Sequence, residues 1–126
     1  MNLSHIDHLV ITTKNVEQCI HFYTQILNMS LIKENNRYSL KFGNQKINIH
    51  TKPREYLPAA KTPMQGSLDI CFIVNDSIES VLYDLQQKDI ILETNIVERI
   101  GALGKMKSIY LHDPDGNLIE LSSYDV

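Results

Sequence analysis

The sequence repeats one order of secondary structure twice, and this duplication constrains the fold more than any other feature. Apolar periodicity predicts a strand, a helix and three more strands in each half, with a repeat of about 55 residues. One helix cannot cover both faces of a four-stranded sheet, so the opposite face must be covered by the other half or line a cavity. We therefore expect an α+β fold built from two βαβββ modules.

The first module is expected to span about residues 1–52. A stretch rich in β-branched residues predicts a strand over residues 5–13. Asn15 is expected to cap a helix with Gln18 as its capping-box partner, and Asn28 is expected to end that helix. Three further strands are predicted at residues 30–33, 37–42 and 46–50, with a Gly43-Asn44 turn before the last of them.

The second module is expected to span about residues 66–126, after a connector of about residues 53–65 that contains three prolines. It begins with a predicted strand over residues 67–74 and a helix capped by Asp76, with Glu79 as the box partner. Strands are predicted around residues 90–94, 108–112 and 118–122. Residues 101–104 are expected to form a mobile loop, and residues 113–117 a tight turn before the last strand.

Composition favours a single domain over residues 1–126. The chain is 43% hydrophobic and 21% charged, its net charge is −3, and scattered basic residues argue against a nucleic-acid partner. No apolar run approaches the ~20 residues of a membrane helix, and the first residues lack a signal peptide, which together favour a cytoplasmic location and no membrane partner. Cys19 and Cys71 lack metal-binding spacing and are expected to be small buried hydrophobes.

Polar residues alternate with apolar ones in the strands that begin and end each module. The side chains expected on the face opposite the helix are His8, Asn48 and His50 in the first module, and Asp69 and Glu120 in the second. Glu120 is a carboxylate within an otherwise apolar strand, and buried carboxylates are paired or bound to a metal. If the first and fourth strands are adjacent and central, we expect His8, His50, Asp69 and Glu120 to meet.

Two imidazoles and a carboxylate suit a first-row divalent ion such as Mn²⁺, Fe²⁺, Co²⁺, Ni²⁺ or Zn²⁺. The predicted ligands are His8, His50 and Glu120, and Asp69 is expected to be either a ligand or a residue that orients a ligating histidine. Such an ion would polarise two adjacent substrate oxygens. The structural alternatives are a core or surface histidine at position 8, a solvent-facing His50, and an ion pair between Glu120 and Arg99.

Two βαβββ halves, the segment HFYTQILNM at residues 21–29 and the segment DPDGNLIE at residues 113–120 resemble the vicinal oxygen chelate superfamily. This superfamily includes glyoxalase I, extradiol dioxygenases, and the fosfomycin and bleomycin resistance proteins. The resemblance covers nearly the whole chain and implies a cup-shaped sheet with metal ligands at His8 and Glu120. Glyoxalase I would have a glutamate near Asn48 and often a histidine at Asp69, so His50 is the expected substitute.

These features predict a divalent-metal-dependent, glyoxalase-like enzyme of the lyase or isomerase type. Its partner would be a small-molecule substrate with vicinal oxygens, and Glu120 would move the proton alpha to a carbonyl. The departures at Asn48 and Asp69 motivate an alternative, a metal-free sequestering protein of the bleomycin-resistance type. An extradiol dioxygenase or thiol transferase is a third option, which Asp69 disfavours. Two modules in each chain also predict a homodimer, with the modules side by side or exchanged.

Overall fold

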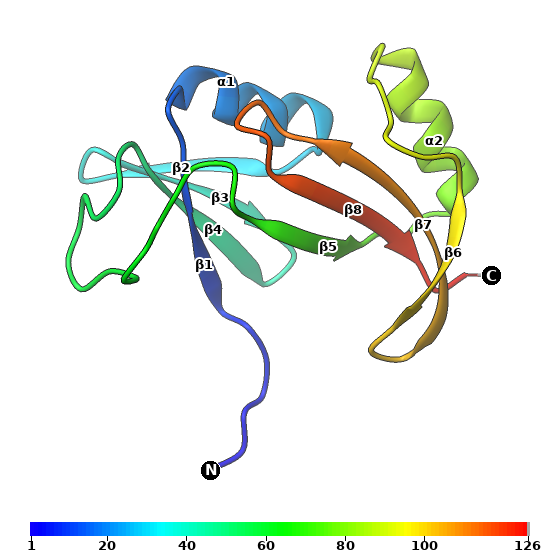
Figure 1. Cartoon of the computed structure of the whole chain (residues 1–126), viewed down its shortest axis with the longest axis horizontal. Coiled ribbons are helices and arrows are strands. Elements are labelled where there is room, and N and C mark those ends of the chain that lie inside the picture. The colour runs from blue at the N-terminus through cyan, green and yellow to red at the C-terminus, as the bar shows by residue number, and fades with distance from the viewer. Residues whose placement is uncertain (126) are drawn as a thin grey trace. The chain divides into compact units, whose positions relative to one another are not determined.

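Two separate four-stranded sheets make up the strand framework of the computed structural model, which describes residues 1–125. The chain divides into two compact units, Met1–Ser67 and Leu68–Val126, and each unit contains one of the sheets. Each unit follows the order strand, helix and three strands, as the duplication predicted (Figure 1). The predicted α+β fold of two βαβββ modules is therefore confirmed.

The first unit places its first and last strands side by side. Its elements are β1 (His8–Thr12), α1 (Val16–His21), the π-helical turn η1 (Phe22–Ile26), β2 (Ser30–Glu34), β3 (Arg37–Phe42) and β4 (Gln45–His50). The strand order is β1-β4-β3-β2, with β1 parallel to β4 and the other pairs antiparallel. The two strands are neighbours as expected, although β1 lies at the end of this order instead of at its centre.

Asparagines fix the start and the end of the first helical segment. The Asn15 side chain accepts a hydrogen bond of 3.0 Å from the Gln18 backbone N–H, which confirms the predicted N-cap. Asn28 has a φ of 61°, the left-handed conformation that ends helices and that asparagine tolerates. Between these residues the hydrogen bonding changes from α1 to the wider turn of η1.

The second unit repeats the first with different bounds from those predicted. Its elements are β5 (Asp69–Ile73), α2 (Ile78–Gln87), β6 (Val97–Gly101), β7 (Gly104–His112) and β8 (Leu118–Ser123), in the sheet order β5-β8-β7-β6. The α2 cap is Ser77, whose side chain accepts from the Ser80 N–H, so the predicted Asp76 cap is wrong by one residue. Ser77 has the extended backbone that an N-cap requires, with φ −68° and ψ 148°.

The strand predicted around residues 90–94 of the second unit is wrong. Residues 90–94 form no strand, and Glu93 makes a single backbone hydrogen bond, from its N–H to the Tyr110 carbonyl. The outer strand is instead β6, because residues 101–104 form the tight turn of the β6–β7 hairpin. Gly101 and Gly104 face each other across that turn, and Gly104 has a φ of 127° that side chains disfavour. This stretch is thus a hairpin turn whose two ends, Gly101 and Gly104, belong to the sheet.

Alternation separates the core of each unit from the opposite sheet face. In the first unit the buried apolar strand residues are Ile11, Leu40, Ile47 and Ile49. The corresponding residues of the second unit are Phe72, Met106, Ile109, Leu111, Ile119 and Leu121, and α2 packs against β7 and β8. Cys19 is buried as predicted, whereas Cys71 is exposed because it lies on the alternate face of β5. In residues 1–125, none of the helices is both long and apolar enough to span a bilayer.

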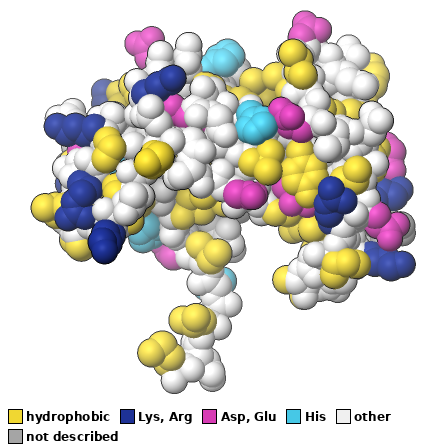
Figure 2. Space-filling view, in the orientation of Figure 1, with side chains coloured by type: hydrophobic (Ala, Val, Ile, Leu, Met, Phe, Trp, Pro, Cys, Tyr) yellow, Lys and Arg dark blue, Asp and Glu magenta, His cyan; other side chains and the backbone are white. Residues whose placement is uncertain are grey.

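Charge is divided unequally between the two units. Eight of the 12 Lys and Arg residues, but only four of the 15 Asp and Glu residues, lie in residues 1–67. The formal charge is therefore +4 in the first unit and −7 in the second, which together give the net charge of −3. Lys and Arg side chains gather accordingly on the left of Figure 2, over the first unit. The basic residues are thus not scattered evenly along the chain.

Candidate functional site

The sheet face opposite the core carries the polar candidates of the first unit. In the parallel pair of β1 and β4, His8 is opposite Lys46, Val10 is opposite Asn48, and Thr12 is opposite His50. His8, Asn48 and His50 therefore share one face, as alternation predicted. His8 and His50 are nevertheless four register positions apart, about 13 Å along the strands at ~3.3 Å per residue.

Among residues 1–125, His8 has a partner for one ring nitrogen and none for the other. Its Nδ1 atom lies 2.8 Å from Oδ2 of Asp7, and its side chain is 47% exposed. This hydrogen bond, more than any other effect, holds the pKa of Asp7 below its ordinary value. A carboxylate on Nδ1 is the arrangement that orients a histidine for metal binding through Nε2. The local geometry of His8 thus fits a ligand.

His50 lies in a different environment from His8. Its ring is edge-on to Tyr56, with the ring centroids 5.1 Å apart, and the Arg37 guanidinium carbon is 3.7 Å from the Tyr56 centroid. Together these residues border a pocket of about 240 Å³, whose lining also includes Glu34, Tyr38, Ser39, Lys46 and Asn48. The structure thus brings His50 to Tyr56 and Arg37, and not to His8. A metal role for His50 stays a prediction that this geometry does not favour.

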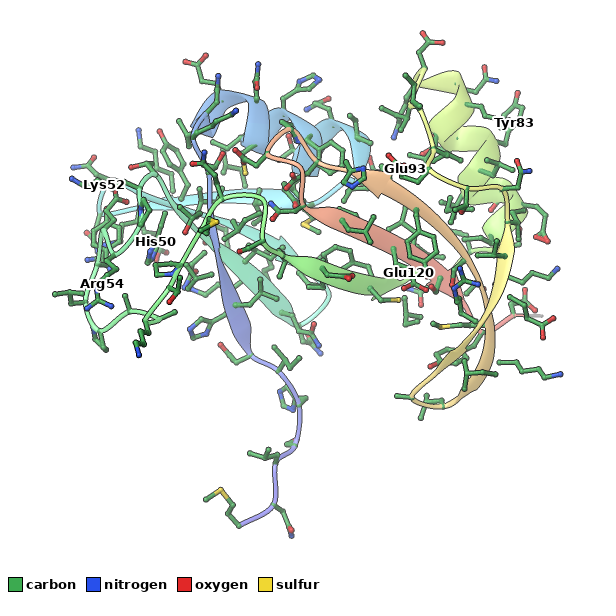
Figure 3. All side chains as sticks on the ribbon, in the orientation of Figure 1. His50, Lys52, Arg54, Tyr83, Glu93 and Glu120 are labelled. Atoms are coloured by element: carbon green, nitrogen blue, oxygen red, sulfur yellow. The ribbon has the colours of Figure 1, made fainter. Side chains whose placement is uncertain are left out.

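Glu120 is half-buried on β8, on the face of the second sheet opposite the core (Figure 3). In the register of β5, β8 and β7 it lies between Cys71 and Tyr110. The Ser122 hydroxyl donates to Oε2 of Glu120 over 3.1 Å, and Cys71 Sγ lies 3.2 Å from the Ser122 hydroxyl oxygen. The Glu120 carboxylate therefore accepts a hydrogen bond from a neutral group and has no cation beside it in these contacts.

Tyr110 links Glu120 to Arg99 at this site. The Arg99 Nε–H donates to the Tyr110 hydroxyl over 3.1 Å, and that hydroxyl also interacts with the Glu120 carboxylate. Burial is the main reason that the pKa of Tyr110 is raised; Arg99 lowers it and Glu120 raises it again. Although Cys71 is exposed as a residue, partial burial of its thiol is the main reason that the pKa of that thiol is raised, and Glu120 adds to the effect. Both groups thus stay protonated near neutral pH and are able to donate hydrogen bonds.

The predicted ion pair between Glu120 and Arg99 is replaced by this connection through Tyr110. Within residues 1–125, the ion pairs of the second unit involve other carboxylates, and Glu120 is in none of them. Sequence reasoning did not single out Cys71 or Ser122 for this site. Both lie an even number of residues from the expected strand ligands, so strand alternation was the signal that could have found them.

The register relates the candidate positions of the two units. Asp69 pairs with Leu118, and Glu120 follows two residues later; His8 pairs with Lys46, and Asn48 follows two residues later. His8 therefore corresponds to Asp69, and Asn48 corresponds to Glu120. By the same rule His50 corresponds to Ser122 and not to Glu120. Among residues 1–125, neither unit by itself groups three His, Cys, Asp or Glu side chains as a metal site.

The fold and the comparison with protein families define the class of this protein. The chain matches the Glyoxalase/Bleomycin resistance protein/Dioxygenase superfamily over residues 5–121, and it belongs to this family. The resemblance seen in the sequence is thereby confirmed.

Individual relatives cover nearly the whole chain. Virulence protein STM3117 of Salmonella typhimurium is 44% identical, over 98% of this chain and 87% of that protein. Its crystal structure has a TM-score of 0.95 to this one and covers 98% of this chain and 99% of that one. Glyoxalase domain-containing protein RDO1 of Mycosarcoma maydis is 46% identical, over 98% of this chain and 70% of that protein. Lactoylglutathione lyase of Schizosaccharomyces pombe is 29% identical, over 98% of this chain and 48% of that protein.

Proposed function

We propose that this protein is a divalent-metal-dependent enzyme of the glyoxalase type that acts on a small substrate with adjacent oxygens. The proposed metal ligands are His8 and Glu120, with Asp69 as a further ligand or as a residue that orients one. The observation that carries the proposal is the state of His8, whose Nδ1 is held by Asp7 while Nε2 is left for a ligand. Membership of the superfamily supports it.

The donor set of the proposed site suits a first-row divalent ion. Such ions take neutral imidazole nitrogens and carboxylate oxygens. Asp69 is exposed at the first position of β5, in the register position that His8 has in β1. It therefore corresponds to a residue that already has the local geometry of a ligand. When bound, the ion would act as a Lewis acid on two adjacent oxygens of the substrate.

Glu120 is the proposed proton-transfer residue. Its carboxylate is half-buried and lacks a cationic partner among residues 1–125, which is the state of a group able to accept a proton from carbon. Ser122 and Tyr110 would orient it, since the Ser122 hydroxyl donates to one carboxylate oxygen and the Tyr110 hydroxyl interacts with the carboxylate. The raised pKa of Tyr110 keeps that hydroxyl protonated for this purpose.

Metal binding is the first test of the proposal. The full chain is treated with a chelator and titrated with Mn²⁺, Ni²⁺ and Zn²⁺, while metal content and melting temperature are measured. We expect one ion to bind and to raise the melting temperature, because a ligand of the native state stabilises it. We expect His8→Ala and Glu120→Gln each to lower the metal affinity at least about tenfold, on the order of 1.4 kcal/mol.

The control variant is His21→Ala, which removes an exposed histidine of α1 and should leave metal affinity unchanged. Far-UV circular dichroism verifies that each variant is folded. Unchanged metal affinity in both His8→Ala and Glu120→Gln would sink the proposal, whereas no metal binding by the wild-type protein would favour a metal-free sequestering protein. A positive result is followed by an activity screen that begins with hemithioacetals, because a relative of this chain is named lactoylglutathione lyase.

A further inference from the structure

The pocket of the first unit is lined by more positive than negative side chains. Arg37 and Lys46 are cationic, and Glu34 is the one carboxylate in the lining that the structure describes. His50 and the nearby Lys52 and Arg54 lie in the part of the unit where Lys and Arg side chains gather (Figures 2 and 3). The unit as a whole carries a formal charge of +4. The charge of the pocket lining and the charge of the whole unit therefore both favour an anionic ligand.

Arg37 is held over Tyr56 in a way that leaves its hydrogen-bond donors available. The guanidinium carbon lies 3.7 Å from the Tyr56 centroid, a distance typical of stacking. Glu34 pairs with Arg37 across the β2–β3 hairpin, yet they form no ion pair. Within residues 1–125, the Arg37 guanidinium makes neither an ion pair nor a hydrogen bond. Its planar fork of N–H groups thus lacks an acceptor among the residues that the structure describes.

The segment after β4 holds Tyr56 in this position. Glu55 accepts hydrogen bonds from the backbone N–H and the hydroxyl of Thr51, and the Arg54 guanidinium donates to the Ala60 carbonyl over 2.8 Å. The Thr51 hydrogen bonds are the main reason that the pKa of Glu55 is lowered, and His50 contributes. Glu55 is therefore an anion that is already engaged with its own turn. Tyr56 follows it directly and contacts both His50 and Arg37.

We propose that this pocket binds a small oxyanion, the carboxylate or phosphate group of a ligand, with the Arg37 fork as its principal donor. Arginine pairs with both groups through two parallel hydrogen bonds, and stacking on Tyr56 holds the guanidinium plane ready for them. Asn48 lies at the same pocket and offers an amide N–H₂. As a substrate site, the pocket rests on the proposed enzymatic function. In that case the substrate carries such an anionic group.

Anion binding is tested on chelator-treated full-length protein, so that its outcome is independent of the metal. Inorganic phosphate and succinate are titrated separately, and the Arg37 Nε–Hε signal is followed by NMR. We expect saturable binding of at least one probe. Arg37→Ala should weaken binding at least about tenfold. Arg37→Lys should weaken it similarly, because lysine keeps the charge but loses the fork and the stacking. Saturation by one probe alone would identify the group that the pocket takes.

Lys61→Ala is the matched control, since it removes an exposed cation of the same segment that does not line the pocket. It should leave binding unchanged. Tyr56→Leu tests the stacking, and circular dichroism with an amide NMR spectrum verifies its fold. The inference is overturned if neither probe saturates, or if Arg37→Lys and Lys61→Ala both bind as the wild type does. If the wild-type protein binds an anion probe but no divalent metal, the proposed function is refuted and the inference about the pocket stands.

Discussion

Asn48 occupies in the first sheet the register position that Glu120 occupies in the second. Asn48 lies on β4, two residues after Lys46, which pairs with His8. Glu120 lies on β8, two residues after Leu118, which pairs with Asp69. The duplicated fold therefore offers equivalent positions for a carboxylate, and the sequence places one in only the second unit. This difference gives a direct way to alter the proposed site.

Asn48→Glu should strengthen divalent metal binding. The change adds an anionic oxygen donor at the position equivalent to Glu120, and first-row ions take such donors. We expect a gain of about tenfold in affinity for Mn²⁺ or Zn²⁺, on the order of 1.4 kcal/mol, measured by isothermal titration calorimetry. Asn44→Glu adds the same charge in the β3–β4 turn and controls for nonspecific attraction. An equal gain in both variants would contradict the equivalence.

The Asp7 carboxyl should titrate below the ordinary aspartate range. Its hydrogen bond to His8 is the first cause of the lowered pKa, and its stabilising effect is therefore present above the unfolded-state pKa and lost as the pH falls through the lowered value. In His8→Ala the pKa of Asp7 should rise toward 3.8. NMR titration of the carboxyl carbon measures both values. A midpoint that does not move would show that His8 does not hold Asp7 in solution.

Ser77→Ala should destabilise the protein more than Asp76→Ala. The Ser77 side chain accepts the hydrogen bond from the Ser80 N–H at the start of α2, and Asp76 is not the cap. We expect Ser77→Ala to lower the free energy of unfolding by about 1 kcal/mol, a typical cost of losing an N-cap. Asp76→Ala should change it by less than about half of that. Urea denaturation of both variants checks the order, and the reverse order would restore the cap that the sequence predicted.

Asn117→Ala should be costly because Asn117 is buried and joins two segments. Its Oδ1 accepts from the Leu68 N–H over 2.8 Å, and its Nδ2 donates to Oδ2 of Asp113 over 2.7 Å. The buried Asp113 carboxylate and the half-buried Leu68 N–H lose these hydrogen bonds in the variant, so we expect a loss of about 2–4 kcal/mol in the free energy of unfolding. Asn75→Ala removes an exposed asparagine and should stay within about 0.5 kcal/mol. A loss no larger than that of Asn75→Ala would contradict the role of these hydrogen bonds.

Several features of the candidate site followed from alternation alone. The two-residue alternation of side chains along a strand assigned His8, Asn48 and His50 to one face of the sheet, and the register of β1 and β4 confirms this assignment. Alternation fixes a face and leaves open how far along the strand two residues lie, because register depends on pairing between distant segments. The separation of His8 from His50 and the contact of His50 with Tyr56 were therefore not predictable.

The sequence by itself determined the βαβββ duplication, the Asn15 cap and the family, because these depend on local periodicity and short-range hydrogen bonds. Tertiary structure alone decided the position of β6, the tight turn at residues 101–104 and the stacking of Arg37 on Tyr56. Each of these depends on a partner distant in the chain or on the backbone path of a turn. Local preference is too weak to select between such pairings, and the packing of the whole unit makes the choice.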